Sequence, residues 1–546
     1  MNYDQTLRTL AKRFGKRAVK TFADKGISVN YCELEKYSRK LCAWLQLRGV
    51  RPGDRIAVWM GNVPEFMLLA AASLRLGTVL VPVSAYEAAA EVQRICDECQ
   101  CEYLFCDGKN KHISKQLKGH GFKVANVIDL GRHEQNETFR LSFIGELKTE
   151  RFEPCEIAPD DSIVISFSSG STGEKKGIKK SMRSYFGEKG FSGLYKRTLS
   201  LVNTLYPIRL YSLFPWCHNT GLTLLLVSLL GGRFQEITCE QYNPVQTLHA
   251  MEQYRPNLWM GTATMLYRCC SLRETGKMYV PAFIISTGEA IPWYIIDKIG
   301  QYSKGRYLFS GYGTTEVGSI AQIVFRLGRP SAGQRLLARL VQLCGVVDAV
   351  HCVEEFADTP DHAILGSIHS GAEVKIFHEE NGEVLPDSEI GEICAYKKSR
   401  MNGYLNEKDE QSFLQYEGKH FFRTGDMGYR KNGLLFLAGR KKNLIIRSGM
   451  KIVPGSIERV ALGCKGVAAA IACGVPSRDR GEDICLCLQT GPAYSEAQLW
   501  LELEKQLPKY SLPAHLLYWE EFPVGATGKT DRKTVQQEAE ARLSAN

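Results

Sequence analysis

The stretch of sequence that decides the fold runs from Ile163 to Gly177 and reads IVISFSSGSTGEKKG. Its first five residues, Ile163 to Phe167, have the apolar composition of a buried strand. The residues that follow are almost all glycines, hydroxyl residues and lysines. Small residues let backbone N–H groups approach phosphate oxygens, hydroxyls add donors, and lysines supply counter-charge. We therefore predict a phosphate-binding loop at the end of a strand. A Walker A loop is excluded, because GxxxxGK[ST] would need glycine where Lys175 stands.

The 150 residues before this loop alternate between helical and strand patterns. Helical spacing is found from Tyr31 to Leu47 and from Phe66 to Leu76. Short apolar strands are expected from Arg55 to Met60 and from Val79 to Val83. The alternation persists to about residue 320 and predicts an α/β fold with largely parallel sheets.

The texture changes after Glu389, where glycine turns separate short strands. This pattern indicates a smaller, mostly antiparallel β-rich region. Beyond Arg440 the chain reads as a compact α+β segment of about a hundred residues, an ordinary size for a small domain. We expect a large N-terminal domain of several subdomains over residues 1–440 and a small C-terminal domain over residues 441–546.

Composition fits a globular protein of more than one domain. The chain has 546 residues, of which 44% are hydrophobic and 23% are charged. Its longest apolar run, Leu222 to Leu230, is about half of what a membrane helix needs and indicates a buried element. The N-terminus lacks the order of a signal peptide. We expect a cytoplasmic protein without integral membrane association.

Eighteen cysteines are compatible with a reducing compartment. Cys96 and Cys99 have the spacing of metal ligands, with Cys101 and Cys106 close behind. No second CxxC or paired histidines follow, so buried, inert thiols are the favoured interpretation over a metal site. The net charge of +10 favours polyanionic ligands. Neither an aromatic-interleaved basic stripe nor zinc-finger spacing supports nucleic acid as a partner.

Further motifs follow the loop in a fixed order. They are Gly288-Glu289-Ala290, Gly311-Tyr312-Gly313-Thr314-Thr315-Glu316, Thr424-Gly425-Asp426, Gly439-Arg440-Lys441-Lys442-Asn443 and Thr527-Gly528-Lys529-Thr530-Asp531-Arg532. The second of these fails as a Rossmann GxGxxG, because Glu316 occupies the last position. Each motif alone is weak evidence, but the ordered set is specific.

In this order the motifs resemble those of the class I adenylate-forming superfamily, which contains acyl-CoA synthetases, adenylation domains of peptide synthetases and luciferases. The loop resembles that family's [ST]SG[ST]TGxPKG and departs from it once, at Lys175, where the family has proline. The resemblance covers nearly the whole chain. It implies ATP and Mg²⁺ as cofactors and a C-terminal domain that moves between two half-reactions about a hinge at Lys442.

The resemblance also implies roles for single residues. The phosphate-binding residues would be Ser168, Ser169, Gly170, Ser171, Thr172, Gly173 and Lys176. Gly288, Glu289, Ala290 and Tyr312 would surround adenine, and Asp426 and Arg440 would contact the ribose. Thr315 would contact the α-phosphate, and Glu316 would hold Mg²⁺, an ion that prefers oxygen ligands. Lys529 would be the adenylation catalyst, and His218 would lie at the acyl pocket.

The implied reaction is activation of a carboxylic acid as an acyl-AMP with release of pyrophosphate, followed by transfer to a thiol. The expected acceptor is CoA, as in an acyl-CoA synthetase. The alternative is a stand-alone adenylating enzyme that loads a carrier protein in trans. A nucleotide-binding protein without catalysis is disfavoured by the intact Glu316, Asp426, Arg440 and Lys529. Residues 212–235 contain no acidic side chain, which argues against an amino acid substrate. The oligomeric state stays open.

One segment departs from the expected length, from about Phe325 to Ala363. Its Leu336, Leu337, Leu340 and Leu343 have helical spacing. Both a helix that caps the fold and an element that docks a partner fit this pattern.

Overall fold

The computed structural model describes the chain except for a set of segments and single residues. These are 107–125, 130–150, 170–174, 188–206, 213, 233, 273–278, 292, 303–305, 330, 333–334, 336–348, 357–362, 407–409, 449, 478, 526–528 and 545–546. The leucines singled out between 336 and 343 lie outside the described residues.

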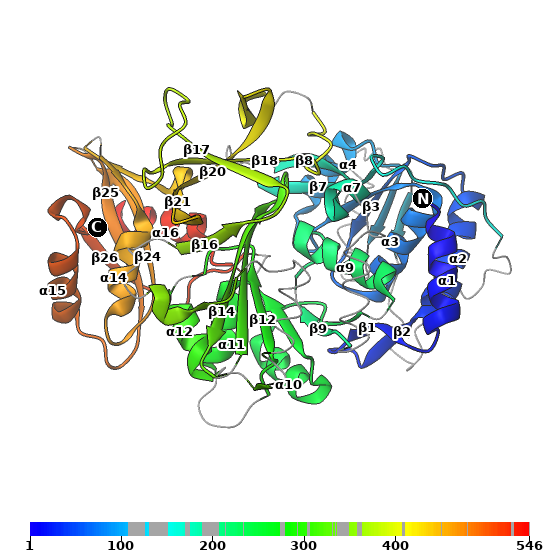
Figure 1. The fold of residues 1–546 in the computed structure, drawn as a ribbon, viewed down its shortest axis with the longest axis horizontal. Helices are drawn as coiled ribbons and strands as arrows, with labels where there is room; N and C mark the ends of the chain where they lie inside the picture. Colours follow the sequence, from blue (N-terminus) through cyan, green and yellow to red (C-terminus); the bar gives the residue numbers. More distant parts are fainter. Residues whose placement is uncertain are drawn as a thin grey trace.

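A six-stranded sheet, in the order β6-β5-β3-β4-β7-β8, forms the N-terminal part of the protein (right in Figure 1). Its pairs are parallel except β7 with β8, which are antiparallel. The strands are β3 (Arg55–Trp59), β4 (Val79–Val83), β5 (Tyr103–Cys106), β6 (Asn126–Asp129), β7 (Ser162–Ser169) and β8 (Lys175–Ser181). The associated helices are α1 (Tyr3–Phe14), α2 (Tyr31–Leu47), α3 (Pro64–Leu76), α4 (Ala89–Glu98) and α7 (Met182–Phe186).

The predicted elements of this part are confirmed, and α2 shows why. Asn30 and Glu33 form a reciprocal capping box at its start, so the helix begins at Tyr31 as expected. In α3 the structure adds Pro64 and Glu65 ahead of the expected Phe66, because proline is well suited to a first helical turn.

A second, larger sheet fills the centre of the molecule, and its first half is parallel. In spatial order the parallel strands are β13 (Arg306–Thr314), β12 (Phe283–Thr287), β11 (Leu258–Gly261), β9 (Arg209–Ser212), β10 (Gln235–Thr238) and β1 (Ala18–Phe22), with β2 (Ile27–Asn30) antiparallel at the edge. The helices between these strands are α9 (Asn219–Gly231), α10 (Pro244–Tyr254), α11 (Ala263–Ser271) and α12 (Trp293–Tyr302). The apolar run at Leu222 is therefore a helix, α9.

The second half of this sheet is antiparallel, except that the short strand β15 pairs with β14 in parallel. The change of topology expected near residue 320 is confirmed, because the parallel strands end with β13 and a turn after Thr314 sends the chain back beside it as the antiparallel β14. The mostly antiparallel character expected after Glu389 is confirmed as well. The sequence did not show that these later strands continue the same sheet. The strands and short helices are β14 (Gly318–Leu327), β15 (His351–Cys352), η2 (Val353–Phe356), β16 (Ala363–Ile368), β17 (Ala372–Phe377), β18 (Gly391–Lys397), η3 (Glu410–Ser412), β19 (Phe413–Tyr416), β20 (Lys419–Lys431) and β21 (Leu434–Arg440).

The C-terminal part has a sheet of its own, reached through the short helix η4 (Lys441–Asn443). Its strands are β22 (Ile445–Arg447), β23 (Met450–Ile452), β24 (Val467–Ser477), β25 (Gly481–Thr490) and β26 (His515–Tyr518). Its helices are α14 (Pro454–Gly463), α15 (Glu496–Gln506), η5 (Lys509–Ser511) and α16 (Arg532–Ser544). Figure 1 shows this part at the left, on the opposite side of the central sheet from α1 and α2.

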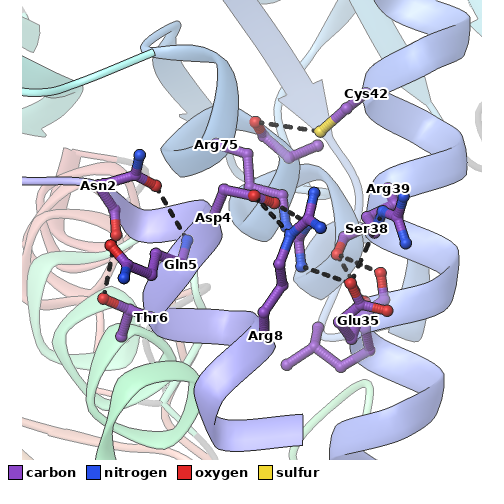
Figure 2. Close-up of polar contacts among 12 residues, drawn as sticks. Asn2, Asp4, Gln5, Thr6, Arg8, Glu35, Ser38, Arg39, Cys42 and Arg75 are labelled. Carbon is purple, nitrogen blue, oxygen red and sulfur yellow. Dashed lines mark hydrogen bonds and ion pairs between the residues drawn. The ribbon is translucent and has the colours of Figure 1, made fainter. Parts of the chain in front are cut away.

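An ion-pair network joins the three N-terminal helices in the core (Figure 2). Arg75 of α3 is fully buried, and its Nη1 lies 2.5 Å from Oδ1 of Asp4 in α1. Its Nη2 lies 3.8 Å from Oε1 of Glu35 in α2. Asp4 also pairs with the exposed Arg8, at 2.6 Å. A buried charge of this kind is tolerated only when it is paired, so the network fixes how the helices meet.

Cys96, Cys99, Cys101 and Cys106 are buried free thiols in the apolar core beside α4, which fits the prediction of inert cysteines. Among the described helices none combines the length and the hydropathy of a membrane span.

Candidate active site

A single large cleft of about 2080 Å³ collects residues from the central sheet, from β8 and from the C-terminal part. Twelve of the residues predicted from the sequence line it: Lys176, His218, Gly288, Glu289, Ala290, Tyr312, Thr315, Glu316, Asp426, Arg440, Lys442 and Lys529. Motifs separated by more than 350 positions in the chain therefore face one space. Its volume is larger than the roughly 300–1,000 Å³ of an ordinary small-molecule pocket.

The phosphate loop is described only at its two flanks. The backbones of Ser168 and Ser169 end β7 and pair with Lys176 and Lys175 of β8. Gly170, Ser171, Thr172 and Gly173 lie outside the described residues. The Nζ atom of Lys175 lies 2.5 Å from Glu87, which precedes α4. Lys175, which stands where the family has proline, therefore forms an ion pair with the segment before α4.

Tyr312, Asp426 and Arg440 form a linked group on one wall. The hydroxyl of Tyr312 donates to Oδ2 of Asp426 at 2.7 Å, and Nε of Arg440 lies 2.8 Å from Oδ1 of the same carboxylate. Asp426 and Arg440 are direct partners in the β20–β21 register, which explains their proximity. Burial raises the pKa of Asp426, whereas Arg440 opposes that shift. The group presents a phenol, a carboxylate and a guanidinium, which suit recognition of hydroxyl groups.

Glu316 lies in the turn between β13 and β14. Its backbone carbonyl accepts from Met401 N–H at 2.7 Å, and burial raises the pKa of its side chain. Among the described residues no lysine or arginine forms an ion pair with it, although Lys180 and Arg440 act on it at longer range. A half-buried carboxylate without an ion-pair partner among these residues fits a hard divalent cation, because such an ion supplies counter-charge.

His218 stands at the entrance to α9, immediately before its first residue. Burial, with Lys529 and Lys175 adding repulsion, lowers its pKa to about 4, so the imidazole is neutral at pH 7. Its Nε2 atom is buried and has no hydrogen-bond partner among the described residues. Such an atom, facing a cleft, is available to a ligand.

The segment that carries His218 rests on a buried ion pair that sequence reasoning missed. Lys20 of β1 pairs with Glu236 of β10, and the Lys20 Nζ atom lies 4.5 Å from the ring centroid of Trp216. All three side chains are fully buried. The only signal in the sequence was a charged residue in each of two apolar strands, which does not reveal the pairing.

Lys529 belongs to the C-terminal part but reaches into the cleft of the larger part. Its Nζ donates to the carbonyl oxygen of Gly288, and Glu289 contributes a favourable charge. Gly288 has φ of +89°, a conformation that favours glycine. Two contacts accompany this approach: Tyr267 donates to the Ala468 carbonyl at 3.0 Å, and Arg268 lies 3.1 Å from Glu521. Thr527 and Gly528 of the same motif lie outside the described residues.

Lys180 is a second cleft residue that sequence reasoning missed. It is buried at the end of β8, and burial lowers its pKa to about 8 while Glu316 opposes the shift. Two adjacent lysines, such as Lys179 and Lys180, are ordinarily typical of a solvated surface. The two-residue period of a strand was the available signal, because it places Lys180 on the same face as the buried Ile178.

Three thiols form the one grouping of three candidate metal ligands within the described residues. The sulfur atoms of Cys473, Cys485 and Cys487 lie within 4.8 Å of one another. They pack in an apolar cluster with Trp519 and Val535, away from the cleft. Their contacts are with one another and with strand backbone, as expected of core thiols.

Comparison with known proteins shows the family to which the chain belongs. Residues 7–405 match the family described as AMP-binding enzyme. The medium-chain acyl-CoA ligase ACSF2, mitochondrial, of Danio rerio is 24% identical over 572 residues, which cover 99% of this chain and 88% of that protein. The D-alanine–D-alanyl carrier protein ligase of Bacillus licheniformis is 24% identical, with coverage of 95% and 96%. The crystal structure of ATP-bound MatB from Rhodopseudomonas palustris matches with a TM-score of 0.79 at 22% identity, over 99% of both chains.

Proposed function

Because the chain belongs to the AMP-binding enzyme family, we propose that it activates a carboxylic acid with ATP and transfers the acyl group to CoA. The family and the curated relatives support an AMP-forming acid ligase. CoA as the acceptor rests on the acyl-CoA ligases among the relatives. The observation that carries the proposal of acid activation is Lys529, which crosses from the C-terminal part to the Gly288 carbonyl inside the cleft.

In the first half-reaction a carboxylate oxygen attacks the α-phosphorus of ATP, and the bond to pyrophosphate breaks. No general base is needed, because the acid is already ionised at neutral pH. The difficulty is repulsion between two anions, which positive charge at the reacting atoms relieves. We assign that task to Lys529, with Lys176 at the phosphates. Thr315 would donate its hydroxyl to the α-phosphate.

The adenosine end would be held by the linked group on the opposite wall. Tyr312 would lie against adenine, and Asp426 would accept from the ribose hydroxyls, with Arg440 orienting it. In the structure both oxygens of Asp426 contact protein groups, so ribose would share or replace the contact with Tyr312. Mg²⁺, when bound at Glu316, would screen the phosphate charges.

In the second half-reaction the thiol sulfur of CoA attacks the acyl carbon, and AMP leaves. Lys529 lies inside the cleft against Gly288, and we propose that the C-terminal part carries it away by rotating about Lys442 between the steps. The neutral His218 at the entrance to α9 would border the acyl group.

A pyrophosphate exchange screen tests the proposal. Purified protein, ATP and labelled pyrophosphate are incubated with aliphatic, aryl and amino acids in separate reactions. We expect exchange with at least one non-amino acid, followed by consumption of free CoA and formation of the thioester. Absence of exchange with every class would contradict acid activation. Exchange without use of CoA would contradict only the acceptor.

The second candidate is an adenylating enzyme that loads a carrier protein. The similarity to the D-alanine–D-alanyl carrier protein ligase favours it. The same assay separates the two: isolated acyl-AMP is offered to free CoA and to a holo carrier protein, and the faster discharge identifies the acceptor.

A further inference from the structure

Lys180 is a buried cation in the cleft wall to which the proposed reaction assigns no task. Its side chain is 1% exposed, and it belongs to β8, the strand that follows the phosphate loop. Its Nζ lies 3.0 Å from the carbonyl oxygen of Thr315 and 3.2 Å from Oδ1 of Asn219. The ammonium also lies 4.7 Å from the ring centroid of Tyr185.

Two donors of the ammonium are thus engaged by protein oxygens, and an aromatic face lies beside the charge. A lysine held in this way is suited to tie protein groups together. The two oxygens belong to different halves of the cleft. Thr315 directly precedes Glu316 in the β13–β14 turn, and Asn219 is the first residue of α9, directly after His218.

The charges around Lys180 point the same way. Glu316 attracts it, while Lys397, whose Nζ donates to the Ser319 carbonyl at 3.2 Å, repels it. Removal of the ammonium would take one donor from the half-buried Thr315 carbonyl and from the half-buried Asn219 amide oxygen, and it would leave Glu316 with Arg440 alone as a favourable charge. Such a loss costs more than an exposed contact does.

We propose that Lys180 is a positioning residue that ties the Thr315–Glu316 turn to the start of α9, and so couples the nucleotide half of the cleft to the acid half. The inference rests on the proposed function, because it needs both substrates to occupy this cleft. Coupling of this kind is reciprocal: the acid should tighten ATP binding by the same factor as ATP tightens binding of the acid.

The test measures that coupling factor without turnover. Calorimetry with α,β-methylene-ATP, whose scissile bridge cannot break, gives the nucleotide dissociation constant with and without a saturating acid identified by the exchange screen. We expect the acid to tighten nucleotide binding in the unmodified protein, and Lys180→Met to abolish most of that effect. In pyrophosphate exchange we expect kcat to fall roughly 10- to 100-fold, the loss expected for hydrogen bonds to a buried charge. Lys180→Arg should recover part of both quantities.

Lys179→Met is the matched control, because Lys179 precedes Lys180 on the same strand, loses the same charge and does not line the cleft. It should keep the coupling factor and kcat. If Lys180→Met does not fold, Asn219→Ala removes one oxygen of the tie from the other side and should weaken the coupling too. An unchanged coupling factor in the Lys180 variant, or none in the unmodified protein, would overturn the inference. Absence of exchange in the unmodified protein would instead contradict the proposed function.

Discussion

Among single residues, Lys529 has the clearest consequence, because its ammonium already lies in the cleft beside Gly288. Lys529→Ala should slow acyl-AMP formation by at least about a hundredfold, a typical loss for one preorganised charge contact. Thioester formation from supplied acyl-AMP should persist, because that step does not use the lysine. Pyrophosphate exchange and single-turnover thioester formation measure the two steps. Lys533→Ala, an exposed change in α16, is the control. Normal exchange in the Lys529 variant would contradict its role.

His218 predicts a dependence of stability on pH. Its pKa falls from 6.5 when unfolded to about 4 in the native cleft. Between these values the unfolded chain binds a proton that the native protein does not, so stability falls as pH falls from about 6.5 towards about 4. His218→Gln removes this contribution, and its melting temperature should depend less steeply on pH in that window. If the melting temperatures of the two proteins change equally with pH across this window, His218 is not buried in its neutral form.

At the scale of helices, the Arg75 network predicts an unequal effect of two similar substitutions (Figure 2). Arg75→Met leaves Asp4 buried without its main partner, which should lower the free energy of unfolding by about 3–5 kcal/mol. Arg8→Met removes an exposed partner of the same Asp4, whose loss should cost at most about 1 kcal/mol. Chemical denaturation followed by helix circular dichroism compares them. Equal losses would mean that burial does not control the strength of these pairs.

The helices and strands were predicted well where the local sequence has a clear hydrophobic period and a clear start signal. Helical spacing predicted α2 from Tyr31 to Leu47, and the capping box of Asn30 and Glu33 explains why it begins there. The apolar run from Arg55 predicted β3 to within one residue. The β13–β14 hairpin itself was not predicted, because Tyr312 and Glu316 were interpreted by their chemistry, and nothing local indicates that the strand reverses there. The pairing of strands within the sheets could not be predicted. For example, β1 pairs with β10, more than 200 residues away, and no sequence period encodes that contact.

In the cleft, too, residues with a local sequence pattern were predicted, and residues that depend on long-range contacts were not. Its motif residues were found because each carries a recognisable local pattern, and twelve of them line one space. Lys180 and the pair of Lys20 with Glu236 were not found, because the meaning of a charge in a strand depends on what the fold places opposite it. Buried charges of this kind become visible only when tertiary contacts are known.

At the scale of the whole molecule, the structure shows the C-terminal part closed over the cleft with Lys529 inside it. We propose that this arrangement serves adenylation and that thioester formation needs a different one. The polar contacts named between the two parts, at Tyr267, Arg268 and Lys529, can form and break without exposing a large apolar core. The chain passes between them through η4, where no side chain is buried. These features suit a swing between two closed states.

Lys442, in the middle of η4, is where that swing can be tested. Proline fixes φ near −65°, removes a backbone donor and restricts the preceding residue, so Lys442→Pro should block a large dihedral change at this point. We expect the variant to keep a substantial part of pyrophosphate exchange and to lose most thioester formation from isolated acyl-AMP and CoA. Lys442→Ala removes the same side chain but leaves the backbone free, so it should retain thioester formation. If both variants lose thioester formation, the loss comes from the missing side chain and not from the restricted backbone. If the proline variant loses both half-reactions equally while its fold stays normal, the rotation occurs elsewhere or is not needed.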